Sequence, residues 1–193
     1  MQEDSKLIQR LAEFVFLDRD GVINVEKELL HTKSDIEIIP GSAEAIKILN
    51  DNNYKVIVIT NQPVIARGLC TLEELADIHK YMESFLAKKG AKLDKIYFCP
   101  HHPKVGNNPL YTKDCDCRKP KPGMILQAQK DFNIKDLSKC YMIGDTIGDI
   151  KTGYLAGCKT ILVETGYGGK EGFKDAVPDY KAKDLYGAVI NII

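Results

Sequence analysis

Excess charge of either sign is absent from this sequence of 193 residues. Lys and Arg together number 27 and Asp and Glu together number 27, so the formal net charge is zero. A neutral chain has no general electrostatic attraction to nucleic acid or to an anionic membrane surface. We therefore expect neither as a partner.

Long hydrophobic runs are also absent. No apolar run approaches the roughly 20 residues that a membrane-spanning helix needs. Met1–Arg10 is polar and mixed in charge, without the basic and then apolar layout of a signal peptide. An apolar fraction of 44% and a charged fraction of 28% are ordinary for a soluble globular protein. We expect one domain over residues 1–193, monomeric and cytoplasmic.

Short aliphatic and β-branched segments alternate with longer segments of helical spacing. Apolar runs of this length are typical of strands that are buried on both faces. Strands are predicted at Glu13–Leu17, Lys55–Thr60, Lys95–Cys99, Cys140–Ile143 and Lys159–Glu164, and helices at Ser42–Asn52, Thr71–Lys89, Pro122–Asp131, Ile147–Ala156 and near Asp184–Ile192. This order predicts an α/β fold, a Rossmann-like parallel sheet with right-handed crossovers and helices on both faces.

Ligands of such sheets bind beyond the carboxyl ends of the strands, so the residues that follow each strand are the first candidates. Asp18 and Asp20 follow the first predicted strand directly. Two carboxylates so placed can share a divalent cation, and one can attack phosphorus while the other transfers a proton. Asp and Gly are also common in solvated turns, so this pair alone does not identify a site.

Three further segments supply matching chemistry. Thr60 and Asn61 end the second strand with a hydroxyl and an amide, which suit phosphoryl oxygens but also suit a helix cap. Lys119 follows Arg118 in a basic pair that is otherwise an ordinary exposed feature. Asp145 ends the fourth strand and can complete a Mg²⁺ site. Asp149 can support that site or stabilise the start of a helix.

The ordered set Asp18-x-Asp20, Thr60, Lys119 and Asp145 resembles the haloacid dehalogenase superfamily of aspartyl-phosphate enzymes. The resemblance implies that Asp18 is the nucleophile and Asp20 the general acid and base. It further implies that Asp18, the main-chain carbonyl of Asp20, and Asp145 hold Mg²⁺, and that Thr60 and Lys119 bind the transferred phosphoryl group. An acid at position 20 can activate water, which favours a phosphatase.

A cysteine-rich segment forms the second strong signal. Three of the six cysteines and a histidine form the pattern C-x-H-x13-C-x-C, with Cys99, His101, Cys115 and Cys117. Four such ligands suit a closed tetrahedral zinc site with a structural role, which would hold the irregular loop at about 99–120. Free thiols are the alternative. His102 is an alternative ligand, and His101 is chosen because its spacing matches the family pattern.

No long insertion separates the predicted motifs, so we expect no cap domain and assign specificity to short loops. Within the superfamily, the segments Asp18–Val25, Thr60–Gly68 and Cys99–Pro120 are similar to phosphatases of heptose bisphosphate. That resemblance implies removal of the C7 phosphate of D-glycero-D-manno-heptose 1,7-bisphosphate, a step towards nucleotide-activated heptose for surface polysaccharide. The substrate residues it implies are Glu26, Lys27, Glu28, Leu29, Thr60, Asn61, Gln62, Pro63, Arg118 and Lys119.

Two departures from that pattern concern Pro63, where a small Ser is usual, and Thr146, where a Lys is common. Arg67 is an additional candidate for the substrate site and is equally well explained as a packing or surface residue. Histidinol-phosphate phosphatases share the zinc loop and the catalytic motifs and remain an alternative. A zinc-stabilised phosphate-binding module without activity is an alternative of another class, against which the pair Asp18 and Asp20 argues.

Overall fold

The computed structural model describes residues 13–172 and 174–193, and the expectation for Met1–Arg10 lies outside this part. Within it, six strands form one sheet in the order β3-β2-β1-β4-β5-β6, and every neighbouring pair is parallel. The strands are β1 (Glu13–Leu17), β2 (Tyr54–Asn61), β3 (Lys95–Cys99), β4 (Tyr141–Gly144), β5 (Lys159–Val163) and β6 (Tyr180–Ala182). The predicted parallel α/β fold is confirmed.

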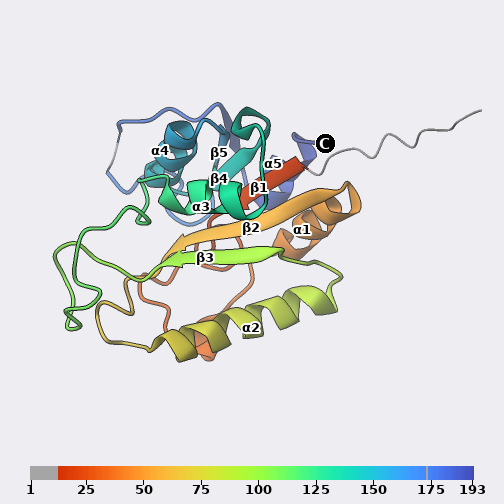
Figure 1. Ribbon diagram of the computed structural model, residues 1–193. Coiled ribbons are helices and arrows are strands. Elements are labelled where there is room, and N and C mark those ends of the chain that lie inside the picture. Colours follow the sequence, from red (N-terminus) through yellow and green to blue (C-terminus); the bar gives the residue numbers. More distant parts are fainter. Residues whose placement is uncertain (1–12, 173) are drawn as a thin grey trace, which may run out of the picture.

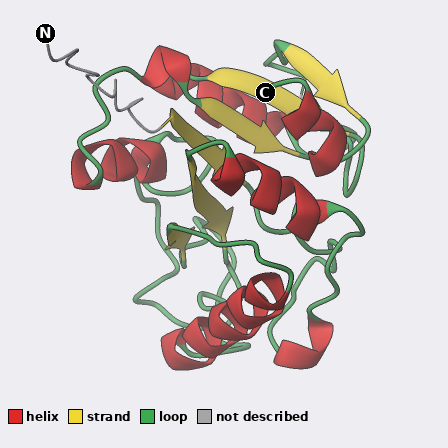
Figure 2. Cartoon of the chain, turned by 90° about the vertical axis from the view of Figure 1, so that its right-hand side faces the viewer, coloured by secondary structure: helices red, strands yellow, loops and turns green. Residues whose placement is uncertain are grey.

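Helices cover both faces of this sheet (Figures 1 and 2). They are α1 (Ser42–Asp51), α2 (Leu72–Lys88), α3 (Gly123–Asp131), α4 (Ile147–Ala156) and α5 (Leu185–Ile190), with short 3-10 helices η1 (Lys33–Asp35) and η2 (Leu137–Lys139). No helix among these residues combines the length and the apolar character that spanning a bilayer requires.

Side chains of β1 alternate between two buried clusters. Val15 and Leu17 lie in one cluster with apolar residues of α1, α2 and α5, whereas Phe16 lies in the other with residues of α3. Successive side chains of a strand point to opposite faces, so a run that is apolar throughout buries both faces. The carboxyl-terminal half of β1 is therefore fully buried, and the polar residues begin directly after it.

The C-terminal part differs from the prediction. Strand β6 was not expected, because its three residues are half-buried or exposed and show no apolar run. It forms by pairing with β5, and the Asp179 carboxylate before it accepts hydrogen bonds from the backbone N–H and the hydroxyl of Thr160 at 2.7 and 2.9 Å. The last helix is shorter than predicted, since Asp184 is its N-cap and accepts from the Gly187 N–H at 2.8 Å.

Candidate active site

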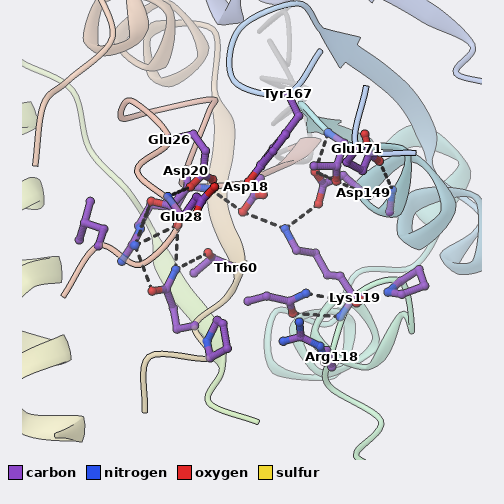
Figure 3. Close-up of a pocket in the computed structure, with 18 of the residues that line it drawn as sticks. Asp18, Asp20, Glu26, Glu28, Thr60, Arg118, Lys119, Asp149, Tyr167 and Glu171 are labelled. Atoms are coloured by element: carbon purple, nitrogen blue, oxygen red, sulfur yellow. Dashed lines mark hydrogen bonds and ion pairs between the residues drawn. The ribbon is translucent and has the colours of Figure 1, made fainter. Parts of the chain in front are cut away.

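Asp18 lies directly beyond β1, at the carboxyl edge of the sheet. Its backbone N–H donates to the carbonyl of Ile143 in β4 at 3.0 Å, which fixes the residue between two strands. Its carboxylate accepts from the Arg19 N–H at 2.7 Å and lies 2.8 Å from the ammonium of Lys119. Figure 3 shows the Lys119 side chain extended between Asp18 and Asp149, whose carboxylate lies 2.6 Å away.

Asn61 at the end of β2 positions the backbone of Lys119. The side-chain amide of Asn61 donates to the Lys119 carbonyl at 3.1 Å, and its oxygen accepts from the Lys119 N–H at 3.0 Å. Asn61 thus satisfies both backbone groups of a residue in an irregular loop. The structure gives Asn61 a specific function in holding the cation, in addition to its place in the cavity wall.

Asp149 stabilises the start of a helix, which is one of the two functions that the sequence left open, and it also forms an ion pair with Lys119. With Thr146 it forms a capping box at the start of α4, in which the Thr146 hydroxyl accepts from the Asp149 N–H at 3.1 Å. The Asp149 carboxylate accepts in return from the Thr146 N–H and hydroxyl at 3.1 and 2.6 Å. Its second oxygen is left for Lys119. Helix capping therefore fixes the carboxylate that pairs with the buried cation.

Asp145 is enclosed by backbone. The Tyr167 N–H donates to its Oδ2 at 2.8 Å. A Cβ added at Gly21 or Gly166 would lie 2.2 or 2.1 Å from the same oxygen, and both glycines have positive φ angles, of 76° and 60°. Only glycine fits a backbone that is both left-handed and this close to a carboxylate. The backbone at Gly21 and at Gly166 thus packs directly against the Asp145 carboxylate.

Magnesium fits the donors that meet here. Oxygen atoms of Asp18, Asp145 and Asp149 all lie within 4.8 Å of one another, and carboxylate oxygens are ligands that Mg²⁺ prefers. With all three carboxyls ionised, one ammonium would leave two uncompensated negative charges in a buried site. Burial, with the neighbouring carboxylates, raises the pKa of Asp18 to about 7 and of Asp145 to about 9. A divalent cation would remove this repulsion.

Asp20 lies in a different environment from Asp18. Arg19 donates to its carboxylate through Nε and Nη2, at 3.1 and 2.9 Å, and Asn24 donates to it at 2.8 Å. Gln62 donates to it at 2.9 Å. Although burial opposes ionisation, the Arg19 charge and these hydrogen bonds lower the pKa of Asp20. Two carboxylates one residue apart are thus assigned opposite shifts of pKa by their surroundings.

A cavity of about 490 Å³ lies above these groups. Its walls include Asp18, Asp20 and eight of the ten predicted substrate residues. Lys27, Leu29 and the predicted metal ligand Asp145 are not among the lining residues. The lining residues are Asp18, Arg19, Asp20, Glu26, Glu28, Leu30, Thr60, Asn61, Gln62, Pro63, Val64, Arg118, Lys119, Pro120, Thr146, Gly148, Asp149, Tyr167 and Glu171.

Lys27 and Leu29 lie elsewhere because the loop turns at Glu28, which has a left-handed φ of 54°. Lys27 forms an ion pair with Glu37 at 3.3 Å. Leu29 packs against the buried cluster that contains Val64. The turn leaves Glu26 and Glu28 in the cavity wall and Lys27 and Leu29 outside it.

Cys99, His101, Cys115 and Cys117 come together in the irregular loop. The separations are 3.5 Å for Cys99 to Cys115 and 3.3 Å for Cys115 to Cys117, and His101 Nδ1 lies 3.7 Å from Cys99 Sγ and 3.5 Å from Cys117 Sγ. A tetrahedron with zinc–ligand bonds of 2.0–2.3 Å has edges of about 3.3–3.8 Å. The four ligand atoms therefore fit a zinc ion.

The two neighbouring histidines have separate functions. His102 Nδ1 accepts hydrogen bonds from the backbone N–H groups of Lys104 and Val105, at 3.2 and 2.8 Å, so it organises the next turn. His101 offers its Nδ1 to the cysteines. The Arg118 guanidinium donates to the His101 carbonyl at 2.9 Å. The zinc-type cluster is thus linked directly to a cation in the cavity wall.

Comparison with known proteins decides the family. A family model of HAD-hydrolase-like proteins matches residues 116–188. The chain is 42% identical over 153 residues to the D-glycero-beta-D-manno-heptose-1,7-bisphosphate 7-phosphatase of Yersinia pestis. The matched region covers 79% of this chain and 80% of the Yersinia pestis protein. The corresponding Chlorobaculum tepidum phosphatase is 36% identical over 189 residues and covers 94% of each.

The chain belongs to this family of HAD-like phosphatases. A solved D,D-heptose 1,7-bisphosphate phosphatase from B. bronchiseptica, complexed with magnesium and phosphate, has the same fold with a TM-score of 0.81. It is 32% identical and covers 93% of this chain and 97% of its own. The predicted superfamily is therefore confirmed, and the chain is a phosphoric monoester hydrolase by family.

Several residues of this phosphatase site escaped the sequence reasoning. Arg19 is fully buried between the two aspartates, and His79 contacts it from α2. Tyr167 and Glu171 reach the cavity from the glycine-rich loop, where Glu171 accepts from the Ile147 N–H at the start of α4. Of these residues, only Arg19 could have been found from the sequence, because it lies between Asp18 and Asp20. His79, Tyr167 and Glu171 belong to no motif.

Proposed function

We propose that this chain is a magnesium-dependent phosphatase that removes the C7 phosphate of D-glycero-D-manno-heptose 1,7-bisphosphate through an aspartyl phosphate on Asp18. The observation that carries the proposal is the buried arrangement of Asp18, Lys119 and Asp149 at one end of the cavity, with Asp20 beside it. The names of the most similar relatives supply the substrate.

In the first step, an oxygen of the Asp18 carboxylate attacks the phosphorus of the C7 phosphate. Asp20 is ionised beside Arg19, so it must first take up a proton, which the negative charge of the bound phosphate favours. As the bond between phosphorus and the C7 oxygen breaks, Asp20 gives this proton to that oxygen, and the sugar leaves as a neutral alcohol. In the second step, water attacks the same phosphorus while Asp20 takes a proton from it. The bond to Asp18 breaks, and inorganic phosphate and the Asp18 carboxylate are released.

Positive charge around the phosphoryl oxygens is the main requirement of this chemistry. Lys119 supplies a buried ammonium: burial opposes its charge, but the carboxylates of Asp149 and Asp18 raise its pKa, so it remains protonated. Thr60, whose hydroxyl accepts a hydrogen bond from Gln62 at 2.9 Å, offers that hydroxyl to the transferred phosphoryl group. Asp18, Asp145 and the main-chain carbonyl of Asp20 would hold Mg²⁺, which neutralises phosphoryl charge when bound.

The rest of the cavity suits a phosphorylated sugar. Glu26 and Glu28 offer carboxylates that accept hydrogen bonds from hydroxyl groups, and Asn61, Gln62 and Pro63 also line the cavity. Arg118 gives the cavity a guanidinium besides Lys119, and a guanidinium binds phosphate in a bidentate manner. We assign Arg118 to the C1 phosphate, which stays on the product.

Zinc at the four-ligand cluster would have a structural function, because four protein ligands leave no position for substrate. The hydrogen bond from Arg118 to the His101 carbonyl and the short step from Cys117 to Lys119 connect that cluster to both cations. A site of three thiols and one imidazole requires reduced cysteines, which supports our expectation of a cytoplasmic enzyme. We also propose that the enzyme acts as a monomer.

Histidinol phosphate is the second candidate substrate. The acidic side chains of Glu26 and Glu28 would favour the positive charge of an amino alcohol as well as the hydroxyls of a sugar. The kcat/KM for phosphate release should be compared for the α and β anomers of heptose 1,7-bisphosphate and for histidinol phosphate. We expect one heptose anomer to be preferred, and a clear preference for histidinol phosphate would overturn the assignment.

A further inference from the structure

Arg19 is a fully buried arginine between the two catalytic aspartates. Its side chain is 1% exposed. Buried arginine is rare and requires partners for its charge and its five N–H groups. Asp20 provides the charge, through contacts with Nε at 3.1 Å and Nη2 at 2.9 Å. A bidentate pair of this kind fixes the plane of the carboxylate as well as its position.

His79 holds the other end of the same guanidinium. Its Nε2 lies 3.2 Å from Nη1 of Arg19. Because a guanidinium only donates, Nε2 must be the acceptor of a neutral imidazole. Burial and the Arg19 charge lower the pKa of His79 to about 3, in agreement with that state. The ring also packs edge-on to Phe98 at 5.8 Å, which limits its rotation.

Gln62 closes the network on the side of the cavity. Its carbonyl oxygen accepts from Nη2 of Arg19 at 3.0 Å, and its amide donates to Asp20 at 2.9 Å and to the Thr60 hydroxyl at 2.9 Å. The orientation of the Gln62 amide is thus fixed, because its oxygen must face the Arg19 guanidinium, which only donates, and its nitrogen must face the Asp20 carboxylate, which only accepts. Arg19 and Gln62 therefore hold both oxygens of the Asp20 carboxylate.

We propose that His79 is a positioning residue for the proton transfer by Asp20. His79 fixes the Arg19 guanidinium from α2, and Arg19 with Gln62 holds the Asp20 carboxyl group in the orientation in which it serves the C7 oxygen and then the attacking water. The proposal rests on the proposed function of Asp20. It gives α2 a role in catalysis although no residue of this helix lines the cavity.

The leaving group distinguishes positioning from simple packing. An alkyl phosphate must receive a proton from Asp20 as its bond to phosphorus breaks, since an alkoxide is a poor leaving group. The phenolate of p-nitrophenyl phosphate is a stable anion and leaves without that proton. The parameter kcat/KM covers the steps up to alcohol release, so it isolates the proton donation from the later hydrolysis.

The test compares variants of His79 on two esters with the magnesium-loaded enzyme. His79→Leu removes the hydrogen-bond acceptor that faces Arg19, and His79→Asn supplies an acceptor on a side chain too short to reach it. Each should lower kcat/KM about tenfold for the primary alkyl phosphate that the wild type cleaves best, and less than about threefold for p-nitrophenyl phosphate. His79→Gln places an amide oxygen near the position of Nε2 and should recover most of the loss.

Leu75→Ala is the matched control, because Leu75 is a fully buried residue one turn earlier on α2 and lies in an apolar cluster. It should lower both values by the same factor. Equal losses on the two esters for the His79 variants, or no loss at all, would overturn the proposal. Failure of the wild type to cleave the heptose ester, with other alkyl phosphates cleaved, would instead overturn the proposed substrate and leave this comparison in place.

Discussion

Lys119 lies between carboxylates that follow different strands, Asp18 after β1 and Asp149 beyond β4. Its own backbone is held by Asn61 at the end of β2. One buried lysine therefore connects the segment after β1, the end of β2 and the start of α4, and each of its contacts is charged or involves its backbone. Removal of one of these groups would leave its charged partner buried without compensation, because water does not reach the site to replace it.

Asp18→Asn should abolish turnover and leave the fold intact, because an amide of nearly the same shape cannot form the acyl phosphate. Phosphate release measures the activity, and the circular dichroism spectrum and Tm measure the fold. Substantial remaining activity in a folded variant would refute Asp18 as the nucleophile.

Lys119→Met should lower kcat/KM by about 10²–10³, the usual cost of removing one group that stabilises charge in the transition state. Lys121→Met is the matched control, since Lys121 is two residues later and pairs with Asp114 on the surface at 2.7 Å. Steady-state phosphate release gives both values. Similar activity of the two variants would show that Lys119 contributes no more than a surface lysine.

The metal-free protein should lose stability as the pH rises. Burial raises the pKa of Asp18 from 3.8 to about 7 and of Asp145 from 3.8 to about 9. The folded state therefore binds more protons than the unfolded state from pH 3.8 up to about pH 7 for Asp18 and about pH 9 for Asp145. Stability then falls with pH through that window. Asp20, with its lowered pKa, changes stability only below 3.8.

Magnesium binds the ionised carboxylates and should therefore raise Tm more at about pH 8 than at about pH 5. Thermal unfolding with Mg²⁺ and with a chelator measures the difference at each pH. An equal or smaller effect at the higher pH would contradict the assignment of this carboxylate cluster to a divalent cation.

The strands of the sheet position the carboxylates of the site, while one irregular segment supplies two of the three cationic side chains that line the cavity. Strand ends position Asp18, Thr60 and Asp145, and the loop of residues 100–122 carries Arg118 and Lys119. That loop has no helix or strand of its own and few apolar residues. Its shape depends on the cluster at Cys117 and on the contacts of Asn61 with Lys119, which explains why a structural metal would affect catalysis.

Removal of zinc should lower activity through the loop. Cys117→Ser should lose bound zinc, raise hydrogen exchange over residues 100–122 and decrease kcat/KM, whereas Cys70→Ala, at an isolated buried thiol, should leave all three unchanged. Metal analysis with exchange mass spectrometry measures both properties. Protein that contains no zinc after careful purification would contradict the site.

For the molecule as a whole, the sequence predicts what depends on local patterns. Five strands and the zinc-type cluster follow from apolar runs and from the spacing around Cys99. The partners of Arg19 do not, because His79 is 60 positions away and carries no motif. Strand β6 depends on its neighbour β5, and the exclusion of Lys27 from the cavity depends on one left-handed residue, Glu28. Such features arise only when the chain is folded.

The most direct test of the whole account is the position of the bond that breaks. The ³¹P NMR spectrum of heptose 1,7-bisphosphate should be followed during turnover with Mg²⁺, with Asp18→Asn as the inactive reference. The account predicts that the C7 phosphate signal is replaced by inorganic phosphate while the C1 signal remains. Loss of the C1 signal, loss of both, or no change with the wild type would contradict it.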